Sequence, residues 1–150
     1  MSLRRIPTGI EGLDSMIRGG FPAGSLVIVA GNSGTGKTVF SAQFIYRGII
    51  DYGEKGVYVS FAENQKVFYG NMEGFGFDFE RLEREGKFSF LDMIAVKDGS
   101  LSSVLTMIIK EVRRLGAKRL VIDSFSAMAQ AFKEPIDARI AIHTILSRII

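Results

Sequence analysis

One run of eight residues constrains this 150-residue chain more than any other feature, and it reads Gly31-Asn32-Ser33-Gly34-Thr35-Gly36-Lys37-Thr38. The run fits the pattern G-x-x-x-x-G-K-[ST] without a mismatch. Its three glycines lack a Cβ and tolerate positive φ, so the loop can aim several backbone N–H groups at one anion. Lys37 supplies a mobile charge for the outer phosphates, and the Thr38 hydroxyl is placed to ligate Mg²⁺. The run therefore predicts a loop that binds a nucleoside triphosphate.

The residues on either side of this loop predict a strand before it and a helix after it. Leu26 to Ala30 is a continuous apolar run, which favours a strand buried on both faces. Apolar residues recur at helical spacing from Val39 until Gly53. The loop would then lie at a helix N-terminus, where the dipole favours phosphate. We expect nucleotide contacts from the whole loop and from Val39.

The rest of the chain alternates strand and helix patterns. We expect strands at 56–61, 87–91 and 120–122, and helices at 64–72, 78–85, 100–115 and 136–150. Such alternation implies right-handed crossovers and a parallel sheet covered on both faces. The length and the hydrophobic content of 47% fit one packed domain over residues 1–150. The fold class is therefore α/β, with three layers.

Two carboxylates compete for the metal-binding position opposite the loop. Asp123 directly follows the apolar strand pattern at 120–122, whereas Asp92 follows a strand that alternates polar and apolar residues. We favour Asp123 as the Mg²⁺ carboxylate and interpret Asp92 as a turn or cap residue. Glu63 follows the 56–61 strand at the same sheet edge and is a candidate for orienting the attacking water. The alternative for Glu63 is a solvated loop glutamate.

The composition limits which classes of protein and which kinds of partner remain for this chain. The sequence has no cysteine, so it offers neither disulfides nor thiolate metal sites. No apolar run approaches the roughly 18 residues that cross a bilayer, and we expect a cytoplasmic protein without membrane contact. The net charge of +3 is a modest surplus that only weakly supports nucleic-acid binding. Phe75, Phe77 and Phe79 could stack on bases or pack onto the domain.

Several separated motifs carry a resemblance to KaiC-like ATPases of the RecA superfamily. The matching stretches are Pro7 to Asp14, Gly19 to Gly24, Gly34 to Thr38, Gly74 to Asp78 and Ile122-Asp123-Ser124. The resemblance implies an ATPase core that acts in rings or filaments, with ATP and Mg²⁺ between neighbouring subunits. It implies phosphate and metal binding by Lys37 and Thr38, a Walker B role for Asp123 and a catalytic role for Glu63. KaiC-type members carry two adjacent glutamates where this chain has Ala62-Glu63, so the first glutamate is missing.

The resemblance also leads us to expect one further strand after the 120–122 strand, between it and the strand that precedes the loop. The chain stops at Ile150, inside an apolar helix pattern, so it reads as C-terminally truncated with the later strands absent. We then expect a gap of one strand position, and neither Arg139 nor Arg148 is assigned to a neighbouring subunit's phosphate.

Two functions remain open at this stage. The first is a Mg²⁺-dependent ATP-hydrolysing module that works through contacts between identical subunits. The second is a RadA or RecA-type recombinase relative that binds DNA. The basic residues Arg113, Arg114, Lys118 and Arg119 could contact DNA, or could complement the dipole at the end of the 100–115 helix.

Overall fold

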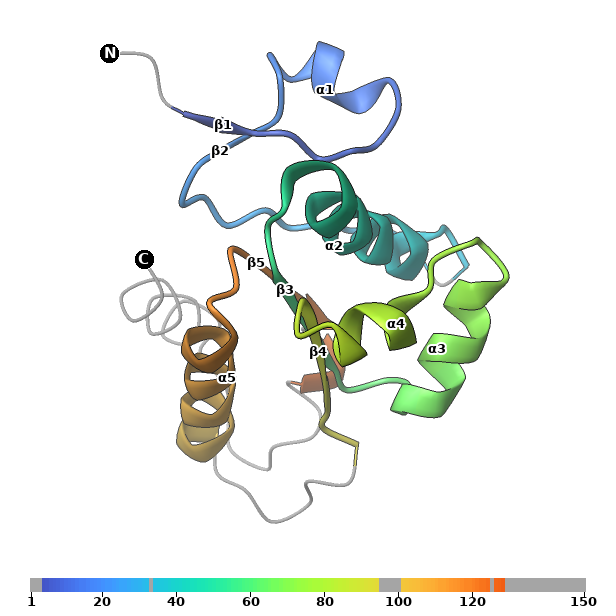
Figure 1. The fold of residues 1–150 in the computed structure, drawn as a ribbon, viewed down its shortest axis with the longest axis vertical. Coiled ribbons are helices and arrows are strands. Elements are labelled where there is room, and N and C mark those ends of the chain that lie inside the picture. Colours follow the sequence, from blue (N-terminus) through green and yellow to red (C-terminus); the bar gives the residue numbers. More distant parts are fainter. Residues whose placement is uncertain (1–3, 33, 95–100, 125, 129–150) are drawn as a thin grey trace.

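The structure is a computed structural model, and it describes residues 4–32, 34–94, 101–124 and 126–128. Short elements lead into the domain (Figure 1): β1 (Arg5–Ile6), α1 (Leu13–Met16) and β2 (Phe21–Pro22). The domain then contains α2 (Lys37–Tyr52), β3 (Gly56–Ser60), α3 (Gln65–Glu73), α4 (Phe79–Arg84), β4 (Phe88–Asp92), α5 (Leu101–Leu115) and β5 (Arg119–Asp123).

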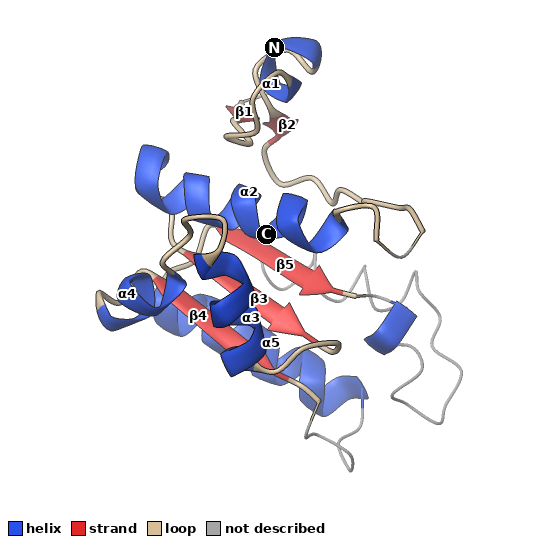
Figure 2. Cartoon of the chain, turned by 90° about the vertical axis from the view of Figure 1, so that its right-hand side faces the viewer, coloured by secondary structure: helices blue, strands red, loops and turns tan. Residues whose placement is uncertain are grey.

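The main sheet of the described residues is parallel and has the order β4-β3-β5 (Figure 2). In its register, Ser60 at the end of β3 lies opposite Asp92 of β4 and Asp123 of β5. The carboxyl ends of all three strands therefore meet at one edge, where open α/β sheets bind ligands. The predicted parallel sheet is confirmed.

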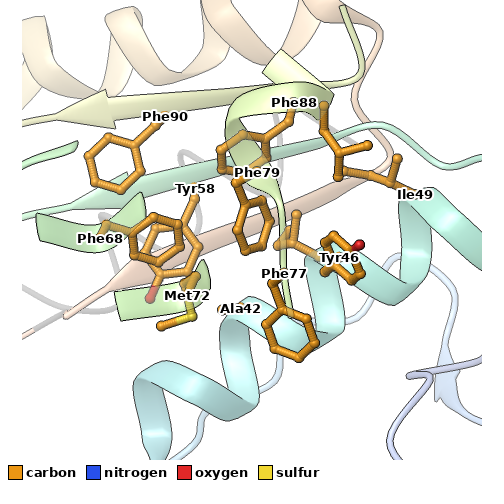
Figure 3. Close-up of a cluster of buried hydrophobic side chains, with 12 residues drawn as sticks. Ala42, Tyr46, Ile49, Tyr58, Phe68, Met72, Phe77, Phe79, Phe88 and Phe90 are labelled. Atoms are coloured by element: carbon orange, nitrogen blue, oxygen red, sulfur yellow. The ribbon is translucent and has the colours of Figure 1, made fainter. Parts of the chain in front are cut away.

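Helices cover both faces of this sheet. The helices α2, α3 and α4 lie on one side of the strands and α5 lies on the other (Figure 1). The first side is filled largely by rings, with Tyr58 and Phe68 centroids 4.5 Å apart and Phe68 and Phe90 centroids 4.9 Å apart (Figure 3). The second side is mostly aliphatic, built from Val57 and Val59 of β3 and from apolar residues of α5. The predicted three-layer α/β fold is confirmed.

Polar side chains cap α3 and α4 close to where the sequence predicted these helices to begin. Asn64 accepts a hydrogen bond from the Val67 N–H at 2.8 Å and caps α3. Asp78 accepts from the Arg81 N–H at 3.2 Å and caps α4. Asp92 accepts from the Ile94 N–H at 3.0 Å, which confirms its turn role. Residue 100, the predicted start of the 100–115 helix, and the predicted helix at 136–150 lie outside the described residues.

The predicted strand at Leu26–Ala30 was wrong. No strand is assigned to these residues, and the side chains from Leu26 to Val29 are 41% to 75% exposed. A strand requires hydrogen bonds to a neighbouring strand, and no described strand pairs with this run. Among the described strands β5 pairs with β3 alone, so the run at 26–30 and β5 do not pair with each other, which is consistent with the expected gap between them. The apolar composition therefore marked a segment that is suited to burial, but it gave no information on whether a neighbouring strand is present to pair with it.

Arg119 connects the segment before β2 to the main sheet. One interpretation of the basic residues placed it at a helix end, but it lies in strand β5. Its guanidinium is almost wholly buried in β5, where it donates to Glu54 Oε1 at 2.9 Å. It also donates to the Phe44 carbonyl at 3.0 Å and to the Pro7 carbonyl. One side chain thereby joins the segment before β2, helix α2 and strand β5.

Within the described residues, no helix is both long and apolar enough to span a membrane.

Candidate nucleotide-binding site

The glycine-rich loop directly precedes α2, as the sequence predicted. Gly34 and Gly36 have φ values of 83° and 91°, in the region that residues with a Cβ rarely adopt. A Cβ on Gly31 would lie 2.8 Å from Thr35 Oγ1. The backbone conformation therefore favours glycine at 34 and 36, and the close Thr35 side chain favours it at 31, while Ser33 lies outside the described residues.

The first turn of α2 suits an anion. Its cap residue Gly36 offers no side-chain acceptor, and no acidic residue lies in the first turn. The helix N-terminus therefore presents N–H groups and a positive dipole end without a competing carboxylate. The Lys37 ammonium lies back over the loop, donating to the Asn32 carbonyl at 2.9 Å and to the Gly31 carbonyl. Val39 follows in the same turn and packs against the aromatic side of the core.

Thr38 and Asp123, predicted as the metal-binding pair, lie side by side. The Thr38 hydroxyl donates to Asp123 Oδ2 at 2.8 Å, which joins the start of α2 to the end of β5. The described residues contain no group of three or more His, Cys, Asp or Glu side chains that could form a protein cage for a metal. Mg²⁺ typically takes one or two protein oxygens and completes its shell with phosphate and water. A threonine hydroxyl beside one carboxylate fits that donor set.

Glu63 lies in the loop after β3 and has an unusual environment. Its backbone N–H donates to Ser60 Oγ at 2.9 Å, and this hydroxyl donates back to the Glu63 carbonyl at 2.8 Å. One oxygen of its carboxylate, Oε2, is buried without a hydrogen-bond partner. Burial raises the pKa of Glu63 above its ordinary value, and the nearby Asp123 charge raises it further. Unpaired buried carboxylate oxygens with a raised pKa are typical of functional sites.

Sequence reasoning missed Tyr58. The Tyr58 hydroxyl donates to Asp123 Oδ2 at 2.6 Å, so Asp123 has a second hydroxyl partner besides Thr38. Burial raises the pKa of Tyr58 far above its usual range, with Asp123 adding to the effect. The available signal was a phenolic hydroxyl between the two valines Val57 and Val59 of the strand. Its partner depends on the register between β3 and β5, which the sequence alone does not specify.

The aromatic residues that could have stacked on bases belong mostly to the core. Phe77 and Phe79 are buried in the aromatic cluster, and only Phe75 is exposed, with its ring stacked on Phe77. Packing, the alternative that the sequence left open, is therefore the role of Phe77 and Phe79.

The fold and this sheet edge place the chain among three-layer α/β proteins whose ligands bind at the carboxyl ends of parallel strands. A family model described as "ATPase: KaiC" matches residues 6–149. The crystal structure of a KaiC-like protein from Pyrococcus horikoshii is 40% identical and superposes with a TM-score of 0.84, over 97% of this chain and 65% of that one. The chain therefore belongs to the KaiC-like ATPases of the RecA superfamily.

Curated relatives agree with this membership. The circadian clock oscillator protein KaiC of Prochlorococcus marinus subsp. pastoris is 36% identical over 99% of this chain and 31% of its own length. A UPF0273 protein of Methanocaldococcus jannaschii is 33% identical over 84% of this chain and 58% of its own length. The chain thus spans about a third of the KaiC protein and somewhat over half of the archaeal one.

Proposed function

We propose that this chain binds Mg·ATP at the loop from Gly31 to Val39 and hydrolyses its terminal phosphoanhydride bond. The observation that carries the proposal is the 2.8 Å contact between Thr38 of the loop and Asp123 of β5. It brings the two predicted oxygen donors to one point at the sheet edge. Glu63 lies close enough for the Asp123 charge to raise its pKa, and it holds an unpaired carboxylate oxygen there.

The loop would bind the phosphates through its backbone N–H groups and the dipole of α2. Lys37 would leave the carbonyls of Gly31 and Asn32, which it contacts in this structure, and donate to phosphate oxygens instead. Thr38 and Asp123 would hold Mg²⁺, directly or through its water shell. Bound Mg²⁺ would neutralise charge that develops on the phosphate oxygens.

Glu63 would orient the water for in-line attack on the γ-phosphate. An ionised carboxylate accepts a proton from water, and positioning within hydrogen-bond reach contributes typically 10²- to 10⁴-fold to such steps. The buried Oε2 has no competing donor among the described residues, so it is free to accept from a water molecule. Ala62 stands where related ATPases carry a first glutamate, and Glu63 would therefore act alone.

Assembly into a ring or filament of identical subunits is part of the proposal. Membership in the KaiC-like family supports it, and the active site would then lie between neighbouring subunits. Sedimentation velocity with and without Mg·ATP measures the assembly, and a strictly monomeric protein under both conditions would contradict it. Cytoplasmic localisation stays a prediction, and so does DNA binding, which turnover assays with single-stranded DNA would test.

Calorimetric titration of Mg·ATP tests the binding site. We expect binding by the parent chain and by Lys66→Ala, an exposed lysine on α3, and loss of binding by Lys37→Ala. Equal binding by Lys37→Ala and the parent would overturn the assignment of the loop.

Measurement of phosphate release then tests the hydrolysis step. Glu63→Gln should bind Mg·ATP but release phosphate at least about 100-fold more slowly than the parent. Unchanged turnover by Glu63→Gln would remove this residue from the mechanism.

A further inference from the structure

We propose that Tyr58 is a positioning residue that fixes the Asp123 carboxylate for the metal of the bound nucleotide. This inference rests on the proposed function, because it concerns the same site. It adds a residue that neither the loop motif nor the strand pattern identified. Tyr58 would touch neither nucleotide nor metal, and would act through Asp123.

Tyr58 itself has little freedom to move. It lies in β3, the central strand, and its side chain is 0% exposed. Its ring packs 4.5 Å from the Phe68 ring and is stacked 5.9 Å from the Phe90 ring (Figure 3). Packing from α3 and β4 thus fixes the ring, and the ring fixes the hydroxyl. A donor held in this way orients its acceptor without losing side-chain entropy when the ligand binds.

Both described donors to Asp123 reach the same oxygen. Thr38 donates to Oδ2 at 2.8 Å from α2, and Tyr58 donates to Oδ2 at 2.6 Å from β3. A carboxylate oxygen accepts about two hydrogen bonds, so Oδ2 is saturated and the plane of the carboxylate is defined. The other oxygen, Oδ1, would then be the one available to the metal or its water shell. The two hydroxyls would therefore decide which oxygen serves the metal.

The Thr38 hydroxyl would serve both Asp123 and the metal, whereas the Tyr58 hydroxyl would serve Asp123 alone. Tyr58 would therefore remain on Oδ2 when Thr38 turns its lone pairs toward the metal. Partners that orient a metal-binding side chain typically contribute 10- to 100-fold to metal affinity. We expect the lower end of that range here, because Asp123 also keeps its Thr38 bond.

The test compares Tyr58→Phe with Tyr69→Phe. Tyr69 on α3 also donates its hydroxyl to a carboxylate, that of Glu83, but this pair is separate from Asp123. Both variants lose one hydroxyl and keep the ring. Affinity for a non-hydrolysable ATP analogue is measured in EDTA, and the affinity of the analogue complex for Mn²⁺ is measured by electron paramagnetic resonance of free Mn²⁺.

We expect Tyr58→Phe to bind Mn²⁺ about 10-fold more weakly than the parent while its analogue affinity in EDTA is unchanged. Tyr69→Phe should match the parent in both measurements. Mn²⁺ affinity within twofold of the parent would overturn the inference. An equal loss of analogue affinity in EDTA would also overturn it, because Tyr58 would then only support the fold.

Two further results keep this test decisive. Failure of the parent to bind the analogue refutes the proposed function together with the inference, whereas normal binding with unchanged Mn²⁺ affinity refutes the inference alone. If Tyr58→Phe does not fold, the parent is used: the sequence has four tyrosines and no tryptophan, so tyrosine absorbance is readable. Mg²⁺ added to the analogue complex should give a tyrosine difference spectrum that Asp123→Asn abolishes, and its absence from the parent would refute the inference.

Discussion

Asp14 organises the segment before β2 through three hydrogen bonds. Its Oδ1 accepts from the Thr8 N–H at 2.9 Å and from the Thr8 hydroxyl at 2.6 Å, and its Oδ2 accepts from the Gly9 N–H at 3.3 Å. The Gly9 carbonyl in turn accepts from Gln43 Nε2 of α2 at 3.1 Å. A single carboxylate therefore shapes a turn that is fastened to the helix carrying the glycine-rich loop.

These contacts make the Asp14 contribution to stability dependent on pH. Burial alone would raise the pKa of Asp14, but the hydrogen bonds from Thr8 and Gly9 outweigh it and lower the pKa below its ordinary value. A lowered folded-state pKa gives stability that is present above the unfolded pKa of about 3.9 and is lost as pH falls through the folded value. Asp14→Asn should therefore reduce the free energy of unfolding at pH 7 by about 1 to 2 kcal/mol.

Urea unfolding at pH 7 and near pH 3 measures this difference. The difference in unfolding free energy between Asp14→Asn and the parent should be smaller at the acidic pH than at pH 7, and the exposed Glu11→Gln should match the parent at pH 7. A gap of the same size at both pH values would contradict the assigned role of the carboxylate.

Individual residues differed in how far the sequence could place them. Thr38 and Asp123 were paired from the loop motif and a strand-end carboxylate, and the structure brings them together. Their roles, and that of Glu63, stay predictions. Tyr58 and Arg119 were not anticipated, because their partners lie 65 residues away along the chain, at Asp123 and Glu54. Contacts between distant segments depend on register and packing, and no local pattern encodes them.

At the scale of elements, α2 and β5 meet unusually closely at Gly48. A Cβ placed on Gly48 would lie 2.4 Å from Arg119 Cδ and 2.7 Å from Arg119 Cζ. The Arg119 side chain cannot move aside freely, since Glu54 and the carbonyls of Phe44 and Pro7 hold it. The glycine is therefore required by packing inside a helix, where glycine is otherwise unfavourable.

Opposite signs are expected for two alanine substitutions in helices. Gly70→Ala in α3 meets nothing within 4 Å and should stabilise the protein by about 0.5 to 1 kcal/mol, the usual helix preference. Gly48→Ala should destabilise it by about 1 to 3 kcal/mol, because overpacking displaces Arg119. Thermal or urea unfolding measures both, and stabilisation by Gly48→Ala would refute the close approach.

The buried ion pair between Arg119 of β5 and Glu54, two residues after the end of α2, gives a second prediction at this scale. Glu54→Ala leaves the Arg119 guanidinium buried without its carboxylate, which should cost about 3 to 5 kcal/mol. Glu85→Ala removes an exposed partner of Arg81 and should cost about 1 kcal/mol or less. Chemical denaturation compares the two variants, and equal losses would show that the Arg119 pair behaves as a surface pair.

Element prediction succeeded where a segment carries its own signals. Caps such as Asn64 and Asp78 and the glycine after α2 mark helix ends locally. Prediction failed at 26–30, where apolar residues fit a strand but no described strand pairs with them. The two-residue strands β1 and β2 were also not predicted, since such short pairs have no periodicity to detect.

At the scale of the whole molecule, β3 and the run at 26–30 differ strongly in burial and in backbone pairing. All five residues of β3 are buried, and the strand is paired on both sides. The run at 26–30 is exposed throughout. Hydrogen exchange read by mass spectrometry should therefore find β3 amides among the slowest and the amides of 26–30 among the fastest. Slow exchange at 26–30 would mean that these residues are paired in solution, within the chain or with another copy.

The contact between Thr38 and Asp123 joins residues 85 positions apart in the sequence. Such a contact closes a long loop of chain, so it forms only once α2, β3 and β5 have come together. A ligand that grips both residues would bind the assembled domain and not its fragments. Its binding energy would then add to the stability of the entire domain, by about 2.7 kcal/mol at a ligand concentration of 100 Kd. Loss of the nucleotide would then lower the free energy of unfolding of the entire domain, and not only the stability of the loop that binds it.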